Sequence, residues 1–93
     1  MTSKPEGMTS NRPYLLRALY QWITDNELTP HILVDAEVDG VVVPEHTIQK
    51  GKVVLNIAEG ATEHLLLDNE IIDFNARFSG QPYKIVIPMG AVI

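Results

Sequence analysis

Polar and apolar residues near the start of the chain follow a helical period over residues 12–27. Successive residues of a helix are rotated by about 100°, so its sequence divides into faces. The polar side chains gather within roughly 100° of the circumference, and they are Arg17, Gln21, Thr24 and Asp25. Apolar residues fill an arc of roughly 200°, about twice the stripe that an ordinary surface helix needs. The pattern predicts a helix whose apolar surface is too wide for one sheet to cover.

The ends of this helix carry residues with known terminal preferences. Ser10 and Asn11 are candidate N-caps, because their side chains accept hydrogen bonds from free backbone N–H groups. Pro13 lies in the first turn, where a missing N–H group costs no hydrogen bond. Asn26 is expected to adopt the left-handed conformation that ends many helices, and Pro30 prevents any continuation.

Two arrangements would cover the wide apolar arc. In the first, the helix lies in a deep groove of a monomer. In the second, one side of the helix rests on the protein's own sheet and the other side packs on a second copy. A chain of 93 residues buries only about 60% of the surface that its unfolded form exposes, so a dimer would enlarge a modest core.

Beyond the helix, apolar and polar residues alternate with a period of two, as in strands with one buried face. Turn-forming pairs separate the segments, and they are Asp39-Gly40, Lys50-Gly51, Asp68-Asn69 and Ser79-Gly80. Residues 45–49 fit neither pattern. The predicted strands are residues 31–38, 41–43, 52–57, 65–67, 71–78 and 83–88, the first two forming a hairpin. The pattern predicts a mainly β (α+β) fold, in which the N-terminal helix precedes a strongly bent antiparallel sheet or small barrel.

The chain divides into a short tail and one domain. Residues 1–11 are polar, contain Pro and Gly and lack periodicity, so they are predicted to be a disordered N-terminal tail. Residues 12–93 are predicted to form a single domain. No apolar run approaches the roughly 20 residues of a membrane-spanning helix, and the first residues lack the apolar segment of a signal peptide. We therefore expect no association with a membrane.

Charge and cysteine content narrow the possible partners. The net charge is −5 at pH 7, and the seven Lys and Arg residues are scattered along the chain. Phosphate contacts dominate nucleic-acid binding, so this acidic balance argues against nucleic acid as the main partner. The absence of cysteine excludes disulfides, zinc–thiolate sites and a thiol nucleophile, and it agrees with a cytoplasmic location.

The sequence contains no recognisable pattern for catalysis or for a cofactor. His31, His46 and His64 are far apart, and none has a partner at a metal-ligand spacing. There is no Gly-rich phosphate loop and no serine in a nucleophile elbow. Asp35 and Glu37 are two residues apart, which is the ordinary spacing of a solvated strand face. We therefore predict that the protein is not an enzyme and has no metal or cofactor.

The fifth predicted strand offers a candidate binding surface instead. One face carries Phe74, Ala76 and Phe78, so a small side chain leaves a notch between two aromatic rings. The other face carries Asn75, whose amide donates and accepts, and Arg77, which pairs with carboxylates. The notch is either part of the core, filled by a large side chain from elsewhere, or a surface for an extended peptide.

Several segments of the chain occur in the same order in one known family. The segments near the N-terminus are Arg12–Ala18, Trp22, Asp25-Asn26 and Leu28–His31. Those further along are Val53–Ala58, Phe74–Phe78 and Ile87–Ala91. On these segments the chain resembles the stringent starvation protein B (SspB) family over about residues 12–93, with only a loose match at residues 39–49.

This resemblance implies a cytoplasmic delivery adaptor. Members of the family bind the ssrA peptide that ribosome rescue adds to stalled chains, and they hand the tagged protein to the ClpXP protease. The resemblance also implies an Sm-like bent β-barrel preceded by a helix, and a homodimer formed through that helix. The expected dimer interface comprises Tyr14, Leu15, Ala18 and Trp22.

The resemblance also implies where the tag binds. The strand Phe74–Phe78 is similar to the one that lines the family's tag groove, which makes Ala76 the expected groove floor. The expected peptide-binding residues are Phe74, Asn75, Ala76, Arg77 and Phe78. The family's domain continues into a flexible tail that docks on ClpX, whereas this chain ends at Ile93, so tag binding is expected here without that docking tail. The alternative is a small Sm-like RNA-binding barrel, against which the acidic charge argues.

Overall fold

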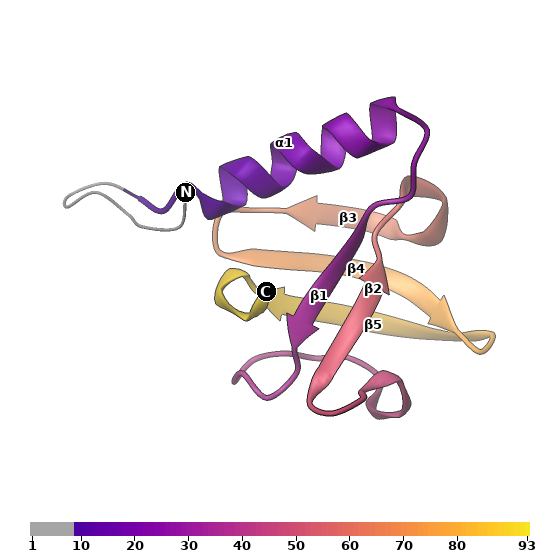
Figure 1. Ribbon diagram of the computed structural model, residues 1–93. Coiled ribbons are helices and arrows are strands. Elements are labelled where there is room, and N and C mark those ends of the chain that lie inside the picture. Colours follow the sequence, from indigo (N-terminus) through magenta and orange to yellow (C-terminus); the bar gives the residue numbers. More distant parts are fainter. Residues whose placement is uncertain (1–8) are drawn as a thin grey trace.

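The computed structural model describes residues 9–93 and consists of one α-helix and two antiparallel sheets (Figure 1). The predicted disordered tail falls largely on residues 1–8, which lie outside the described residues. The helix and strands are α1 (Arg12–Asp25), β1 (His31–Asp35), β2 (Lys52–Asn56), β3 (Glu63–Leu67), β4 (Ile71–Phe78) and β5 (Gln81–Pro88). The short 3₁₀ helices are η1 (Glu45–Thr47), η2 (Glu59–Ala61) and η3 (Met89–Ala91). The predicted class is confirmed, although the two sheets do not close into a barrel.

The N-terminus of α1 is close to the predicted position. Pro13 lies in the first turn, as expected, and it is buried. Asn11 is the N-cap residue but makes no capping hydrogen bond with its side chain. Ser10 supplies that contact instead, since its Oγ accepts the N–H group of Arg12 at 3.2 Å.

No helix among the described residues is long and apolar enough to cross a membrane.

The C-terminus of α1 differs from the prediction in its conformation. Asn26 was expected to be left-handed, and this is wrong, because its φ is −95°. Its side-chain amide donates to the carbonyl of Trp22 at 2.8 Å, which also accepts the backbone N–H of Asn26 at 3.2 Å. Glu27 takes the left-handed conformation instead, with a φ of 59°. The helix therefore ends two residues before the predicted boundary.

β1 and β2 form the smaller sheet. They pair antiparallel, with Leu33 opposite Val54. The burial pattern along each strand alternates, so one face of the sheet is in the core and the other faces solvent. Lys50 and Gly51 both have positive φ values, which confirms the predicted turn that leads into β2.

The predicted hairpin between residues 31–38 and 41–43 is not formed. β1 ends at Asp35, and the chain makes turns instead of a second arm. Val42 crosses to the other sheet and exchanges both backbone hydrogen bonds with Val86 of β5, at 2.8 and 3.1 Å. Pro44 follows and has no N–H group, so this pairing stays short.

β3, β4 and β5 form the larger sheet, with β4 in the centre. β4 has the predicted bounds, and the turn between β4 and β5 is formed by Ser79 and Gly80, both with positive φ. Such a pair matches the two-residue turn whose twist suits a hairpin. β3 contains an irregularity in its pairing at His64, which has a φ of 56°. A bulge of this kind bends an edge strand and limits its pairing.

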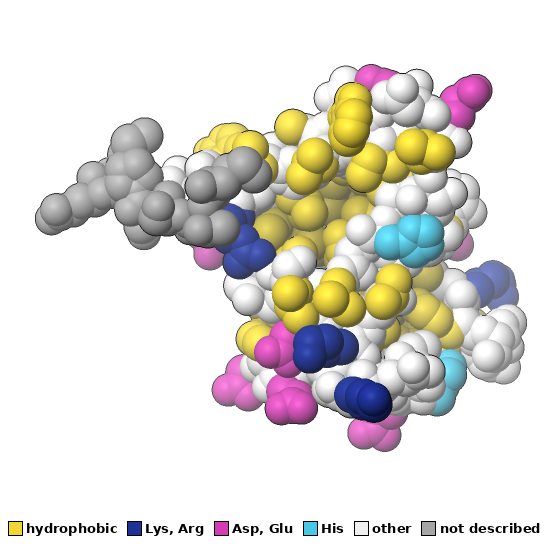
Figure 2. Space-filling view, viewed as in Figure 1, with side chains coloured by type: hydrophobic (Ala, Val, Ile, Leu, Met, Phe, Trp, Pro, Cys, Tyr) yellow, Lys and Arg dark blue, Asp and Glu magenta, His cyan; other side chains and the backbone are white. Residues whose placement is uncertain are grey.

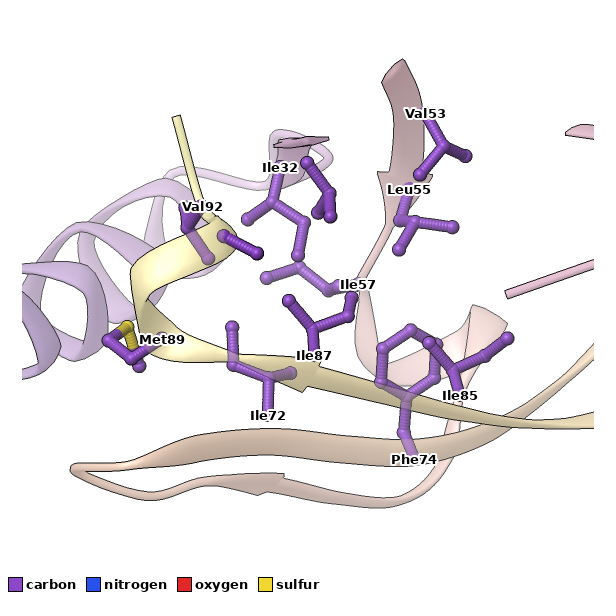
Figure 3. Close-up of a cluster of buried hydrophobic side chains, with 12 residues drawn as sticks. Ile32, Val53, Leu55, Ile57, Ile72, Phe74, Ile85, Ile87, Met89 and Val92 are labelled. Atoms are coloured by element: carbon purple, nitrogen blue, oxygen red, sulfur yellow. The ribbon is translucent and has the colours of Figure 1, made fainter. Parts of the chain in front are cut away.

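The core lies between the two sheets (Figure 3). β2 contributes Val53 and Leu55, which face Phe74 of β4 and Ile85 of β5 in Figure 3. The buried core residues are Ile32, Val34, Val53, Leu55, Ile57, Ile72, Phe74, Ile85, Ile87, Met89, Ala91 and Val92. Since these side chains come from both sheets and from η3, the core is a single layer between the sheets.

Candidate peptide-binding site

The inner face of the β4–β5 ribbon is covered along only part of its length. Phe74 and Ile85 are fully buried, whereas the next inward positions, Ala76, Phe78 and Tyr83, are partly exposed. β2 is the last strand of the smaller sheet on this side, and the β4–β5 hairpin extends past it (Figure 1). The distal end of the ribbon therefore forms an open apolar surface of Ala76, Phe78 and Tyr83, which we call the shelf.

The shelf has a small residue in its centre and aromatic rings beside it. Ala76 lies directly opposite Tyr83 in the β4–β5 register. The Phe78 and Tyr83 rings meet edge to face, with centroids 5.8 Å apart and an interplanar angle of 75°. His46 of η1 lies at one end of the shelf, with its ring centroid 6.0 Å from that of Tyr83. These contacts fix the aromatic side chains around a shallow apolar notch.

A second boundary of the shelf is formed by η2 and the start of β3. A depression of about 400 Å³ at this end is lined by Gly60, Ala61, Thr62, Glu63, Asn75, Ala76 and Arg77. Arg77 is exposed and donates from Nη1 to the carbonyl of Gly80 at 3.2 Å. The depression therefore joins the shelf to polar groups on the outer side of β4.

The five predicted peptide-binding residues fall into three environments. Ala76 and Phe78 are on the shelf, while Asn75 and Arg77 line its polar border. Phe74 is 0% exposed and lies in the core, so it supports the shelf from within and offers no surface of its own. The alternation along the strand placed these side chains on the correct faces, but it could not show where the cover of β2 ends.

Tyr83 and His46 complete this surface and were not identified from the sequence. Tyr83 faces Ala76 across the ribbon, so counting back from the Ser79-Gly80 turn would have paired the two residues. His46 belongs to the segment whose pattern was ambiguous, and no local signal places it against Tyr83. The described residues contain no cluster of three His, Cys, Asp or Glu side chains that could hold a metal ion.

A separate apolar surface lies on α1. Tyr14 and Trp22 are 51% and 64% exposed, Ala18 between them is exposed, and Leu15 is partly exposed. Tyr14, Ala18 and Trp22 are four residues apart and therefore form one stripe along the helix. The arrangement with α1 in a deep groove of a monomer is wrong, because Pro13 is the helix's only buried residue.

The orientation of α1 is fixed by contacts with the sheet. Leu16 and Tyr20 pack against the core. The Arg17 guanidinium donates to the carbonyl of Leu67 at 3.1 Å and to Oδ1 of Asn69 at 2.9 Å. The same guanidinium lies 4.7 Å from the centre of the Tyr14 ring. These contacts hold one side of the helix on the sheet and leave the stripe of Tyr14, Ala18 and Trp22 uncovered.

Further apolar surface continues from the helix toward the C-terminal residues. Figure 2 shows hydrophobic side chains exposed along α1 and a hollow with hydrophobic walls beneath it. A hollow of about 260 Å³ is lined by Arg12, Leu15, Leu16, Leu19, Met89, Val92 and Ile93. Leu19 and Ile93 are themselves 48% and 61% exposed. An apolar surface of this extent on one side of a small domain is typical of an interaction site.

Comparison with known proteins identifies the family. The family model described as "Stringent starvation protein B" matches residues 10–93. The chain is also 50% identical over 82 residues to a stringent starvation protein B homolog of Haemophilus influenzae, an alignment that covers 88% of this chain and 55% of the relative. The chain thus spans about half the length of that relative. The chain belongs to the stringent starvation protein B family.

Proposed function

We propose that this chain is a dimeric, peptide-binding adaptor domain that holds the ssrA degradation tag in extended form on the shelf. Membership of the SspB family supports an adaptor-type role. The observation that carries the proposal is the open apolar shelf of Ala76, Phe78 and Tyr83. Two of these residues belong to β4, the strand that the family resemblance assigns to tag binding.

The chemistry of the shelf favours an extended peptide over a compact ligand. The surface is shallow and apolar, with a notch at Ala76 that a small aliphatic side chain would fill. Asn75 and Arg77 stand at its border and offer an amide and a guanidinium for the polar groups of the peptide. An extended chain places alternate side chains on one surface, so it would meet both the notch and the aromatic rings beside it.

The dimer is proposed on the exposed stripe of α1. Tyr14 and Trp22 present large apolar surfaces on either side of Ala18, whose small side chain lets two helices approach closely. Burial of this stripe against its copy would remove the apolar surface that the chain itself leaves uncovered. The shelf lies on the opposite end of the β4–β5 ribbon from the N-terminus of α1, so both subunits of such a dimer would keep an open site (Figure 1).

Delivery of the bound protein to the ClpXP protease is the role that follows for the whole protein. Because the chain spans about half of its relative, this step is proposed for the complete adaptor in the cytoplasm and rests on the family. Tag binding and dimerisation are proposed for residues 12–93 themselves.

A titration with two ligands tests the proposed function. Fluorescently labelled ssrA-tag peptide and a labelled mixed-sequence single-stranded RNA are each titrated with the protein at low salt, where any phosphate contact is strongest. We expect saturable binding of the peptide at about one per subunit and no anisotropy change with RNA at micromolar protein. Binding of RNA without binding of peptide would replace the adaptor by the Sm-like RNA-binding alternative.

A further inference from the structure

Half of the backbone hydrogen-bonding groups of β2 point away from β1. Two backbone bonds that flank the β1–β2 ladder run from Ile57 N–H to the Pro30 carbonyl and from Ala36 N–H to the Gly51 carbonyl, at 3.0 and 2.8 Å. Bonded and non-bonded pairs alternate in an antiparallel ladder, so the register makes Leu55 and Val53 the bonded residues of β2. The N–H and C=O groups of Val54 and Asn56 therefore point to the open side.

This open edge has no partner within the described chain. No other described residue donates to or accepts from the backbone of Val54 or Asn56 on that side. The same edge is paired only at its start, where Lys52 exchanges two backbone bonds with Gln49, and the outer edge of β5 is paired at Val86 with Val42. An edge with free, regularly spaced donors and acceptors is a template for another strand.

The open edge of β2 borders the shelf. The inward side chains of β2, Val53 and Leu55, lie over Phe74 and Ile85 (Figure 3). The next inward positions along β4 and β5 are the shelf residues, and β2 is the last strand before them (Figure 1). A chain added to β2 at the usual strand spacing of about 4.8 Å would therefore lie over the shelf.

We propose that an extended peptide binds by adding a third strand to the smaller sheet, through the backbone groups of Val54 and Asn56. This inference rests on the proposed function and specifies how the peptide is held. Donors and acceptors on one strand recur every second residue, about 6.6–6.8 Å apart. A polypeptide backbone repeats at the same spacing, which makes an extended peptide the matching occupant.

This mode divides the peptide's recognition between backbone and side chains. The backbone bonds are independent of peptide sequence, while alternate side chains point down to Ala76, Phe78 and Tyr83. Lys52 and Arg77 are exposed near the two sides of the site and form no ion pair among the described residues. A carboxylate on an outward-facing side chain of the peptide would therefore be able to pair with Lys52 or Arg77.

Removing the backbone N–H group of Val54, which has no partner in the free protein, tests whether the peptide binds as an added strand. In Val54→Pro the lost N–H group is not used in the β1–β2 ladder, and proline is tolerated on the open side of an edge strand. We expect the Kd of the labelled tag peptide to rise about tenfold, the order set by one backbone hydrogen bond. The matched control is Val54→Ala, which keeps the N–H group, and its Kd is expected to stay within about twofold of the unchanged protein.

Amide hydrogen exchange supplies a second measurement that needs no variant. In the free protein the Val54 and Asn56 amides should exchange rapidly, while the Val53 and Leu55 amides are protected by β1. Saturation with tag peptide should slow exchange at Val54 and Asn56. Unchanged exchange at both amides, or a Val54→Pro protein with full affinity, would overturn the added strand and leave the proposed function intact. Failure of the unchanged protein to bind the peptide would instead reject the proposed function.

Discussion

Ala76→Gln is the substitution that most directly separates a binding surface from core packing. Ala76 is partly exposed at the centre of the shelf, opposite Tyr83, and it lines the depression of about 400 Å³ beside η2. A glutamine side chain would occupy the notch between the aromatic rings. Its polar end can turn toward solvent through the depression, so the fold should accept it.

The expected loss of affinity follows from the apolar contacts that the glutamine displaces. Burial of one CH₂-sized group is worth about 0.8 kcal/mol, so exclusion of two such groups costs roughly 1.6 kcal/mol. That free energy corresponds to a rise of somewhat more than tenfold in Kd. Overpacking of a closed core site would instead cost about 1–3 kcal/mol of folding free energy, which lowers the Tm by about 4–8 °C per kcal/mol in a domain of this size.

Fluorescence anisotropy with labelled tag peptide and thermal unfolding, measured on the same preparations, distinguish the two cases. Ala36→Gln is the matched control, since Ala36 is also partly buried but lies beyond the end of β1, away from the shelf. We expect the shelf variant to lose affinity with little change in Tm, and the control to keep its affinity. A lowered Tm with full peptide affinity would refute the shelf as the peptide site and return Ala76 to the core.

Two further predictions concern α1. Ala18→Glu should convert the dimer to a monomer in sedimentation, because it places like charges face to face in an apolar interface; a native chain that already sediments as a monomer at tens of micromolar would contradict the dimer. Arg17→Ala removes the hydrogen bonds to Leu67 and Asn69 and should lower stability by about 1–2 kcal/mol. Arg17→Lys keeps the charge without the planar fork and should recover only part of that loss, whereas an unchanged Tm in both variants would show that these bonds do not hold the helix.

The parts of the fold with strong local signals were predictable from the sequence. β4 has the predicted bounds because turn residues flank an unbroken alternation, from Asp68-Asn69 before it to Ser79-Gly80 after it. α1 was predictable because its period is sustained and Pro13 marks its first turn. In both elements the signal lies within the segment itself and needs no knowledge of its neighbours.

Features that depend on long-range pairing were not predictable. Asp39-Gly40 does form a turn. The segment after it could pair with β1 or with β5, and the arrangement of the two sheets places Val42 against β5. The division between Phe74 in the core and Ala76 on the shelf depends on where β2 ends the smaller sheet. The placement of His46 against Tyr83 likewise joins residues that are distant in the sequence.

The two proposed interaction surfaces follow from one property of this small domain. Its smaller sheet has only two strands, too few to cover the whole β4–β5 ribbon, and α1 carries more apolar surface than the sheet can accept. The uncovered ribbon becomes the shelf, and the uncovered side of α1 becomes the stripe on which the dimer is proposed. Because the shelf and the stripe belong to different elements, with Arg17 holding the helix near the β3–β4 turn and Tyr83 at the other end of the ribbon, a change in one should leave the other in place. The proposed dimer should therefore persist whether or not a peptide is bound.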